Sequence, residues 1–177
     1  MNDSACENFY PTDLAAIYAY TSDAEVTRYL FHHPQHQADT QAYLEFLLRS
    51  QRQHPRKIWD LAIIRELDQH LIGSCDLTLT DDRNADLGIV LARTAWGKGY
   101  GCEAVIAITE AGFTQLHLSL IIATCTIDNT RSRQLLEKAG FRCQTRLDYH
   151  HWAKGRWWSS YIYCAHHHSW ASSRGRS

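Results

Sequence analysis

Three glycines at alternate positions make the segment Trp96-Gly97-Lys98-Gly99-Tyr100-Gly101 the part of this chain that most clearly suggests chemistry. Glycine lets a backbone turn tightly and leaves its N–H groups uncovered. Uncovered N–H groups at the start of a helix, together with the helix dipole, bind anions. Lys98 adds a positive charge, so the segment predicts a site for a diphosphate.

Other interpretations of this segment are a ligand-free turn, a Walker A loop and a dinucleotide site. Glycine is common in plain strand–helix turns, so the first stays open. A Walker A loop needs Ser or Thr after its lysine, and Gly99 follows Lys98. Gly99-x-Gly101-x-x-Ala104 matches the dinucleotide fingerprint, with Asp128 ending the next apolar run. That fingerprint normally opens a longer doubly wound domain, so it is a remote alternative.

The glycine segment is placed by a predicted strand over Asp86–Ala92 and a predicted helix over Gly101–Gln115. Other apolar runs and helical spacings predict the remaining elements. The predicted strands are Ile58–Ile64, Leu71–Leu79, Leu120–Ile127, Phe141–Tyr149 and Trp157–Cys164, and the predicted helices are Tyr10–Tyr20, Ala24–Phe31, Asp39–Arg52 and Ser132–Ala139. This order indicates an α/β fold with a mixed sheet.

Bulk composition indicates an ordinary globular domain. The chain has 177 residues, 45% hydrophobic residues and a formal net charge of −1. The mixed charges lack the basic face that nucleic-acid binding requires. We expect no membrane span, because no apolar run is long enough. The N-terminus lacks a signal-peptide pattern and the six cysteines are scattered, so we expect reduced thiols in a cytoplasmic protein.

Histidine-rich segments at His150-His151 and His166–His168 suggest a metal site, but Cys and His at zinc-site spacings are missing. We therefore expect no metal. Residues 1–165 are predicted to form one domain, and residues 166–177 a frayed polar tail.

The glycine segment resembles motif A of the GNAT acetyltransferases, Gln/Arg-x-x-Gly-x-Gly/Ala, with Trp96 at the Gln/Arg position. A second block, Asn129-Thr130-Arg131-Ser132 followed by Leu135–Phe141, resembles the RimJ/RimL-like branch of ribosomal-protein N-terminal acetyltransferases. Thr21–Leu30 is a weaker likeness, and together these cover roughly residues 10 to 165. Relatives usually begin with a clear strand, of which Ser4–Pro11 is a poor version, so we expect a short or missing first strand.

The resemblance implies a single-domain GNAT-like fold, with a mixed, mostly antiparallel sheet of about six to seven strands flanked by helices. It implies acetyl-CoA as cosubstrate, without a metal, and direct attack on the thioester by a primary amine, of a protein N-terminus or a small molecule. The implied cosubstrate-binding residues are Ile89, Val90, Leu91, Trp96, Gly97, Lys98, Gly99, Tyr100, Gly101, Asn129, Ser132 and Lys138. Sheet core, an N-cap and solvated charges are the plain alternatives for these residues.

For catalysis the resemblance places a carboxylate near Asp86 and a thiol-side hydrogen-bond donor at Ser132. Asp has an ordinary pKa of about 3.9, so Asp86 must be desolvated to act as a base. Many family members carry a tyrosine acid where this chain has Leu136, which makes Ser132 the candidate donor.

Rival bases and acceptor-side residues are His32, His33 and Asp76, and Trp157 is a candidate for the substrate cleft. A binding protein that senses acyl-CoA without turnover is the alternative function. The sequence leaves the acceptor and a homodimer open.

Overall fold

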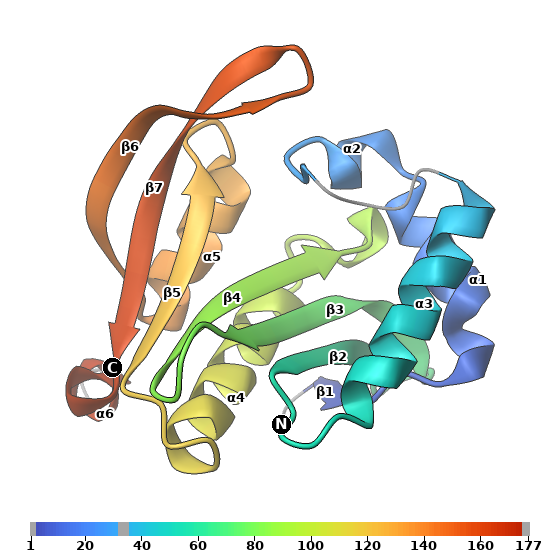
Figure 1. Ribbon diagram of the computed structural model, residues 1–177, viewed down its shortest axis with the longest axis horizontal. Helices are drawn as coiled ribbons and strands as arrows, with labels where there is room; N and C mark the ends of the chain where they lie inside the picture. Colours follow the sequence, from blue (N-terminus) through green and yellow to red (C-terminus); the bar gives the residue numbers. More distant parts are fainter. Residues whose placement is uncertain (1–2, 32–35, 175–177) are drawn as a thin grey trace.

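The computed structural model describes residues 3–31 and 36–174, and these form one seven-stranded sheet in the order β1-β2-β3-β4-β5-β7-β6. Figure 1 shows the sheet with helices packed around it. The strands are β1 (Ser4–Glu7), β2 (Ile58–Arg65), β3 (His70–Leu79), β4 (Asn84–Leu91), β5 (Leu120–Thr126), β6 (Arg142–Ala153) and β7 (Arg156–His166). The helices are α1 (Leu14–Thr21), α2 (Ala24–Thr27), α3 (Gln37–Gln51), α4 (Tyr100–Thr114), α5 (Thr130–Ala139) and α6 (His167–Arg174), with 3-10 turns η1 (Pro11–Asp13) and η2 (Arg93–Ala95).

The sheet confirms the predicted α/β class and its mostly antiparallel character. In the described part of the chain β4 and β5 are the one parallel pair, and every other neighbouring pair is antiparallel. A doubly wound dinucleotide domain has a mostly parallel sheet, so this topology argues against the dinucleotide alternative.

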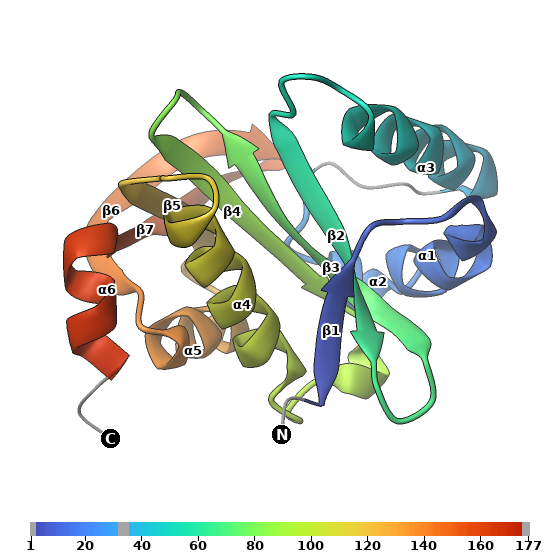
Figure 2. The ribbon, with the colours of Figure 1, turned by 90° about the horizontal axis from the view of Figure 1, so that it is seen from below.

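The two faces of the sheet carry separate cores. Figure 2 shows α4 and α5 on one face and α1 and α3 on the other. Leu77 and Ile121 are buried with Val105 of α4, whereas Ala62 is buried with Ile17 and Leu44 of α1 and α3. The central strands therefore send alternate side chains into two apolar layers, as period-two geometry requires.

The first strand is present and short, which agrees with the first of the two expectations, short or missing. Ser4–Glu7 pairs with β2, with Ser4 opposite Arg65. The backbone N–H of Asp3 and the hydroxyl of Ser4 both donate to Glu103 Oε2 on α4, at 3.1 and 3.0 Å. These contacts with α4 anchor a strand of four residues that shows too little alternation to be recognised from sequence.

The segment after His166 is also different from its prediction, because it forms α6 rather than a frayed tail. Trp170 is buried, and its ring lies 5.8 Å from both Phe113 and Phe141. One large aromatic side chain closes the end of the core. A single tryptophan among polar residues gives no helical periodicity, so the sequence did not reveal this helix.

Helix α2 ends at Thr27, four residues before its predicted end at Phe31. Asp23 is its N-cap, and its carboxylate accepts from the Glu25 N–H at 2.9 Å. The other predicted helices and strands are confirmed, with ends that differ by a few residues.

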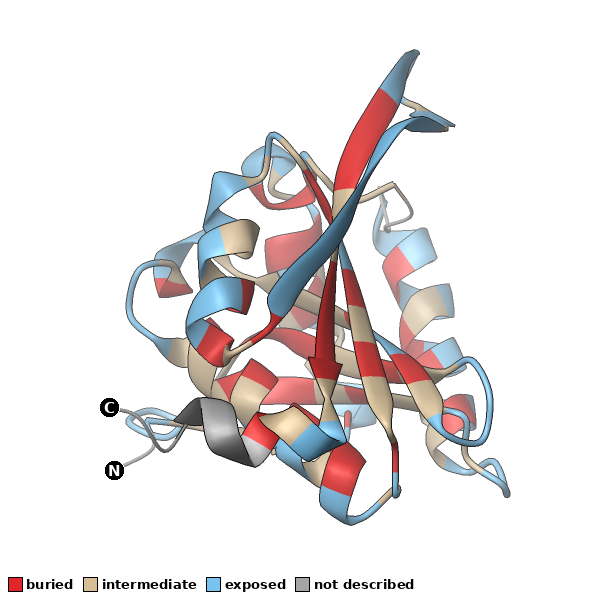
Figure 3. Cartoon of the chain, turned by 90° about the vertical axis from the view of Figure 1, so that its left-hand side faces the viewer, coloured by how far each residue is buried: buried red, intermediate tan, exposed pale blue. Residues whose placement is uncertain are grey.

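The β6–β7 hairpin projects from the body of the molecule. Figure 3 shows β6 exposed along nearly its whole length, while the central strands carry buried residues. Lys154 and Gly155 turn the hairpin with φ of 50° and 73°. No helix in the described part of the chain is long and apolar enough to cross a bilayer.

Candidate active site

The main cavity opens where β4 and β5 part. The two strands pair only from Asn84–Asp86 to Leu120–Ile122. Beyond that point, residues 87–91 of β4 and 123–126 of β5 line opposite walls of a cavity of about 790 Å³. The edge of β4 is therefore free to pair with an extended ligand, as a further strand would.

The glycine turn lies at the end of β4 and borders this cavity. Gly97 and Gly99 have φ of 74° and 95°, which favours glycine at both positions. A Cβ on Gly97 would meet nothing within 4 Å, so conformation rather than crowding selects glycine there. Gly99 is the N-cap of α4 and provides no side-chain cap. The first N–H groups of α4 are consequently left for a ligand.

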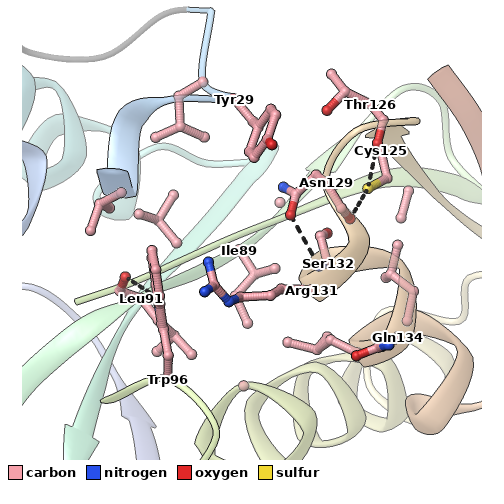
Figure 4. A pocket seen from close by; sticks show the side chains of 18 of the residues that line it. Tyr29, Ile89, Leu91, Trp96, Cys125, Thr126, Asn129, Arg131, Ser132 and Gln134 are labelled. Carbon is pink, nitrogen blue, oxygen red and sulfur yellow. Dashed lines mark hydrogen bonds between the residues drawn. The ribbon is translucent and has the colours of Figure 1, made fainter. Parts of the chain in front are cut away.

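Trp96 connects the turn to the strand and to α5. Its Nε1 donates to the carbonyl oxygen of Leu91 at 2.9 Å. The guanidinium carbon of Arg131 lies 4.6 Å from the centre of the Trp96 ring, and Figure 4 shows this stack beside the cavity. The guanidinium is permanently charged and suits phosphate. A structural role for Trp96 explains why it can replace the usual Gln or Arg.

Arg131 lines the cavity, yet the sequence reasoning gave it no role. The sequence nevertheless contained a signal for such a role. Arg131 stands in the first turn of α5, where a positive charge is unfavourable to the helix dipole. A basic residue in that position suggests that an anion compensates it.

The start of α5 lies across the cavity from the glycine turn. Asn129 is the N-cap, because its Oδ1 accepts from the Ser132 N–H at 3.2 Å. The Cys125 thiol donates to the carbonyl oxygen of Asn129 at 3.6 Å. Burial raises the pKa of Cys125, against a smaller lowering by the Ser132 hydroxyl, so this thiol stays neutral. Cys125 is a further site residue that the sequence did not single out.

Most of the predicted cosubstrate residues meet at this cavity. Those that line it are Ile89, Val90, Leu91, Trp96, Gly97, Gly99, Gly101, Asn129, Ser132 and Lys138. Among the described residues, the lining excludes Lys98 and Tyr100: Lys98 is exposed, and Tyr100 packs against the core beneath α4. Glycine backbone, rather than these two side chains, therefore borders the cavity.

The predicted acceptor-side residues are more scattered. Asp86 is exposed on β4, and partial burial raises its pKa. Trp157 is 54% exposed near the hairpin tip, 5.6 Å from the Trp152 ring, and is outside the cavity lining. His32 and His33 lie outside the described residues. Asp76 lies on β3 directly opposite Gly88, which does line the cavity.

Tyr29 and Phe31 form a bridge over the cavity that the sequence did not indicate. Both line it, and both rings contact Trp158 of β7, at 6.3 and 5.4 Å between centres. The Tyr29 hydroxyl donates to the carbonyl oxygen of Asp128 at 3.1 Å. Lys154 donates to the carbonyl oxygen of Thr27 at 2.8 Å. The segment after α2 and the hairpin are thus joined above the site.

Comparisons with known proteins agree with this geometry. A model of the acetyltransferase (GNAT) domain matches residues 7–142. An uncharacterized N-acetyltransferase p20 of Bacillus licheniformis is 37% identical over 103 residues, which is 57% of this chain and 57% of that protein. The matched segment thus spans little more than half of that relative.

Solved structures share the fold over almost the whole chain. A GNAT-family acetyltransferase from Bacillus anthracis has a TM-score of 0.83 with 25% identity, covering 94% of this chain and 96% of that one. A spermidine N-acetyltransferase from Vibrio cholerae, solved with CoA and spermine, has a TM-score of 0.82 with 18% identity, covering 96% and 98%.

The chain therefore belongs to the GNAT acetyltransferase family. Enzymes of this family use acetyl-CoA.

Proposed function

We propose that this chain transfers the acetyl group of acetyl-CoA to a primary amine by direct attack. The observation that carries the proposal is the parting of β4 from β5 beside the glycine turn. One cavity thereby joins a free strand edge, an uncapped helix N-terminus and a serine at the start of a second helix. The GNAT family supports the same activity.

The residues present fit acetyl-CoA. The open side of Gly97 and the first N–H groups of α4 suit the diphosphate. Arg131 and Lys138, both lining the cavity, supply positive charge. The backbone of Ile89, Val90 and Leu91 would pair with the pantetheine arm. Lys98 and Tyr100 fit less well as side-chain contacts, so their contribution is through the backbone.

Acetyl-CoA supplies an activated acyl group, and the protein supplies orientation and proton transfer. Ser132 would donate a hydrogen bond or a proton on the thiol side. Its backbone N–H is held by Asn129, which fixes the start of α5 without engaging the serine hydroxyl. Leu136, at the position of the family's tyrosine acid, has no hydroxyl to donate a proton, so it does not compete for that role. Asp86 on β4 and Asp76 on β3 are the candidates for the base.

The two sequence blocks favour the RimJ/RimL-like branch, and the acceptor is a protein N-terminus or a small-molecule amine. The likeness in fold to a spermidine N-acetyltransferase makes polyamines worth including among acceptors. The alternative is an acyl-CoA sensor without turnover, which Leu136, in place of the tyrosine, leaves open, while the glycine turn and Ser132 favour catalysis.

Thiol release from acetyl-CoA in the presence of a panel of amines tests the proposal. The panel should contain spermidine, peptides with free N-termini, amino acids and an aminoglycoside. We expect amine-dependent thiol release with at least one acceptor, and thermal stabilisation by acetyl-CoA but not by NAD. Stabilisation by acetyl-CoA without turnover on any amine would favour the sensor, and stabilisation by NAD alone would reject the assignment.

A further inference from the structure

Three neighbouring strands carry Asp60, Asp76 and Gly88 in one row. Asp60 of β2 lies opposite Asp76 of β3, and Asp76 lies opposite Gly88 of β4. Directly opposed residues on antiparallel strands have side chains on the same face, about 5 Å apart. The two carboxylates are therefore neighbours, and both face the layer of α1 and α3.

The missing side chain of Gly88 makes room for Asp76. A Cβ built on Gly88 would collide with Oδ1 of Asp76, the nearest atom to it. The carboxylate of Asp76 thus leans over β4 at a residue that lines the cavity. Val90, two residues further along the same strand, also lines it, so this part of β4 borders the acetyl-transfer site.

The rest of the pair is enclosed by hydroxyl groups. Tyr43 of α3 donates to Oδ2 of Asp60 at 2.9 Å, and Thr78 donates to Oδ2 of Asp76 at 3.3 Å. Oδ1 of Asp60 is buried and has no hydrogen-bond partner among the described residues. Asp60 is 9% exposed, so an ionised carboxylate there is poorly solvated. The arrangement favours a proton held within the pair.

Burial and neighbouring carboxylates add to this effect, and one cation opposes it. Burial first, and then Asp76, raise the pKa of Asp60 to about 7, with Arg56 acting in the opposite direction. Burial first, and then Asp86 of β4, raise the pKa of Asp76 to about 6. Tyr43 of α3 and Tyr20 of α1 are neutral, because burial raises the pKa of each phenol. Arg56 is the single cation among the described groups that act on the pair.

We propose that Asp76, supported by Asp60, takes the proton that the acceptor amine loses, from its place against Gly88, a residue that lines the cavity. This inference rests on the proposed acetyl transfer. The amine nitrogen forms a bond to the acetyl carbon, and the carbon–sulfur bond breaks with its electron pair on sulfur. The second proton of the nitrogen, lost as the amide forms, passes by way of the Ser132 hydroxyl to the thiolate. The ammonium proton of the incoming acceptor goes to Oδ1 of Asp76, and Asp60 shares it.

The pair also explains why Asp86 is the weaker candidate. Asp86 is exposed to solvent at the outer end of the same face, two residues before Gly88 on β4. A solvated carboxylate stays a weak base, whereas the enclosed pair is basic near neutral pH and holds its proton away from bulk water. Asp86 then acts as a distant negative charge on Asp76.

The test compares pH profiles of kcat/KM for the wild type, Asp76→Asn, Asp60→Asn and Asp86→Asn, with the exposed turn residue Asp82 changed to Asn as the matched control. Wild-type kcat/KM should rise with pH through an apparent pKa between about 6 and 7, which belongs to the pair. Asp76→Asn should have a kcat/KM lower by about 100-fold or more, and its kcat/KM should no longer rise with pH in this range. Asp60→Asn should keep the rise but reduce it to the titration of Asp76 alone, because its coupled partner can no longer ionise. Asp82→Asn should match the wild type.

Two further readouts separate this inference from the proposed function. Stabilisation by acetyl-CoA should be the same in Asp76→Asn as in the wild type. ¹³C-carboxyl NMR of the free protein should show raised titrations for Asp60 and Asp76, each of them absent from its own Asn variant. An unchanged pH profile in Asp76→Asn, or loss of the rise in Asp86→Asn instead, overturns the inference while acetyl transfer stands. A wild type without turnover on any amine removes the proposed function and the inference together.

Discussion

The indole Nε1 of Trp96 donates to the carbonyl oxygen of Leu91 at 2.9 Å, and this bond fixes the glycine turn to the end of β4. Leu91 belongs to the strand edge that faces the cavity, and Trp96 stacks against Arg131 of α5. One side chain therefore sets the distance between the edge of β4, the start of α4 and the start of α5.

Replacing Trp96 by phenylalanine should loosen this connection. The change removes one hydrogen bond, so we expect a loss of about 0.5–1.5 kcal/mol in the free energy of unfolding and a several-fold weaker affinity for acetyl-CoA. Chemical denaturation and calorimetry measure the two effects. The control is Trp157→Phe, at a 54% exposed residue outside the cavity. Equal losses of affinity in the two variants would contradict the role given to Trp96.

Gly97 and Gly155 form a matched pair for testing the glycine turn. They have φ of 74° and 73°, and a Cβ on either would meet nothing within 4 Å. Alanine at either position should cost about 1 kcal/mol of stability, because an L side chain disfavours this conformation. Only Gly97→Ala should weaken acetyl-CoA binding as well. A loss of binding in Gly155→Ala, or none in Gly97→Ala, would argue against anion binding at the turn.

Arg131→Ala should weaken acetyl-CoA binding by about 10-fold, because a hydrogen bond to a charged group contributes about 1.5 kcal/mol or more. The salt dependence of the affinity should fall in this variant, since one charge that faces the phosphates is gone. Titrations at two ionic strengths measure both effects. Arg142→Ala, at an exposed residue of the edge strand β6, should leave both unchanged. An Arg131 variant with wild-type affinity and salt dependence would remove this residue from the site.

Asp60→Asn should change how stability depends on pH. Burial first, and then Asp76, raise the pKa of Asp60 in the folded protein to about 7, whereas the unfolded chain has an ordinary value of about 3.9. The folded state therefore binds more protons between about pH 4 and 7, and wild-type stability falls as pH rises through that window. Each unit of pKa difference corresponds to about 1.4 kcal/mol.

Asparagine cannot ionise, so Asp60→Asn should lose stability less steeply than the wild type between pH 4 and 7. Urea unfolding at several pH values measures this, with Asp82→Asn expected to follow the wild type. Parallel stability curves for the wild type and Asp60→Asn would show that Asp60 is not titrating in that range.

The fold was largely predictable because its elements carry local signals. The glycine turn, the apolar run of β5 and the Gly140 that ends α5 with a φ of 101° are each encoded by a few adjacent residues. Strand β1 and helix α6 are not encoded locally, because each is held in place by residues far away in the sequence. Glu103 anchors the start of β1, and the rings of Phe113 and Phe141 hold Trp170 of α6.

The candidate site, like the fold, has a part that the sequence predicted and a part that it could not predict. Gly97 was found from the spacing of the glycines and Ser132 from the resemblance to the GNAT motif, and both line one cavity. The Asp60–Asp76 pair could not be found, because it depends on the register of β2 against β3 and on the missing side chain of Gly88. Tyr29 likewise could not be found, because it is held at the site by Trp158 of β7, which lies more than a hundred residues further along the chain.

The central claim is that the turn at Gly97–Gly101 holds the diphosphate of acetyl-CoA while the acyl arm lies along β4. Amide chemical shifts of the ¹⁵N-labelled protein, recorded with increasing acetyl-CoA, test it most directly. Our account predicts the largest changes at the amides of Gly97, Gly99 and Gly101, with a second group at Ile89–Leu91. Saturable changes confined to other parts of the chain, or no changes at all, would contradict it.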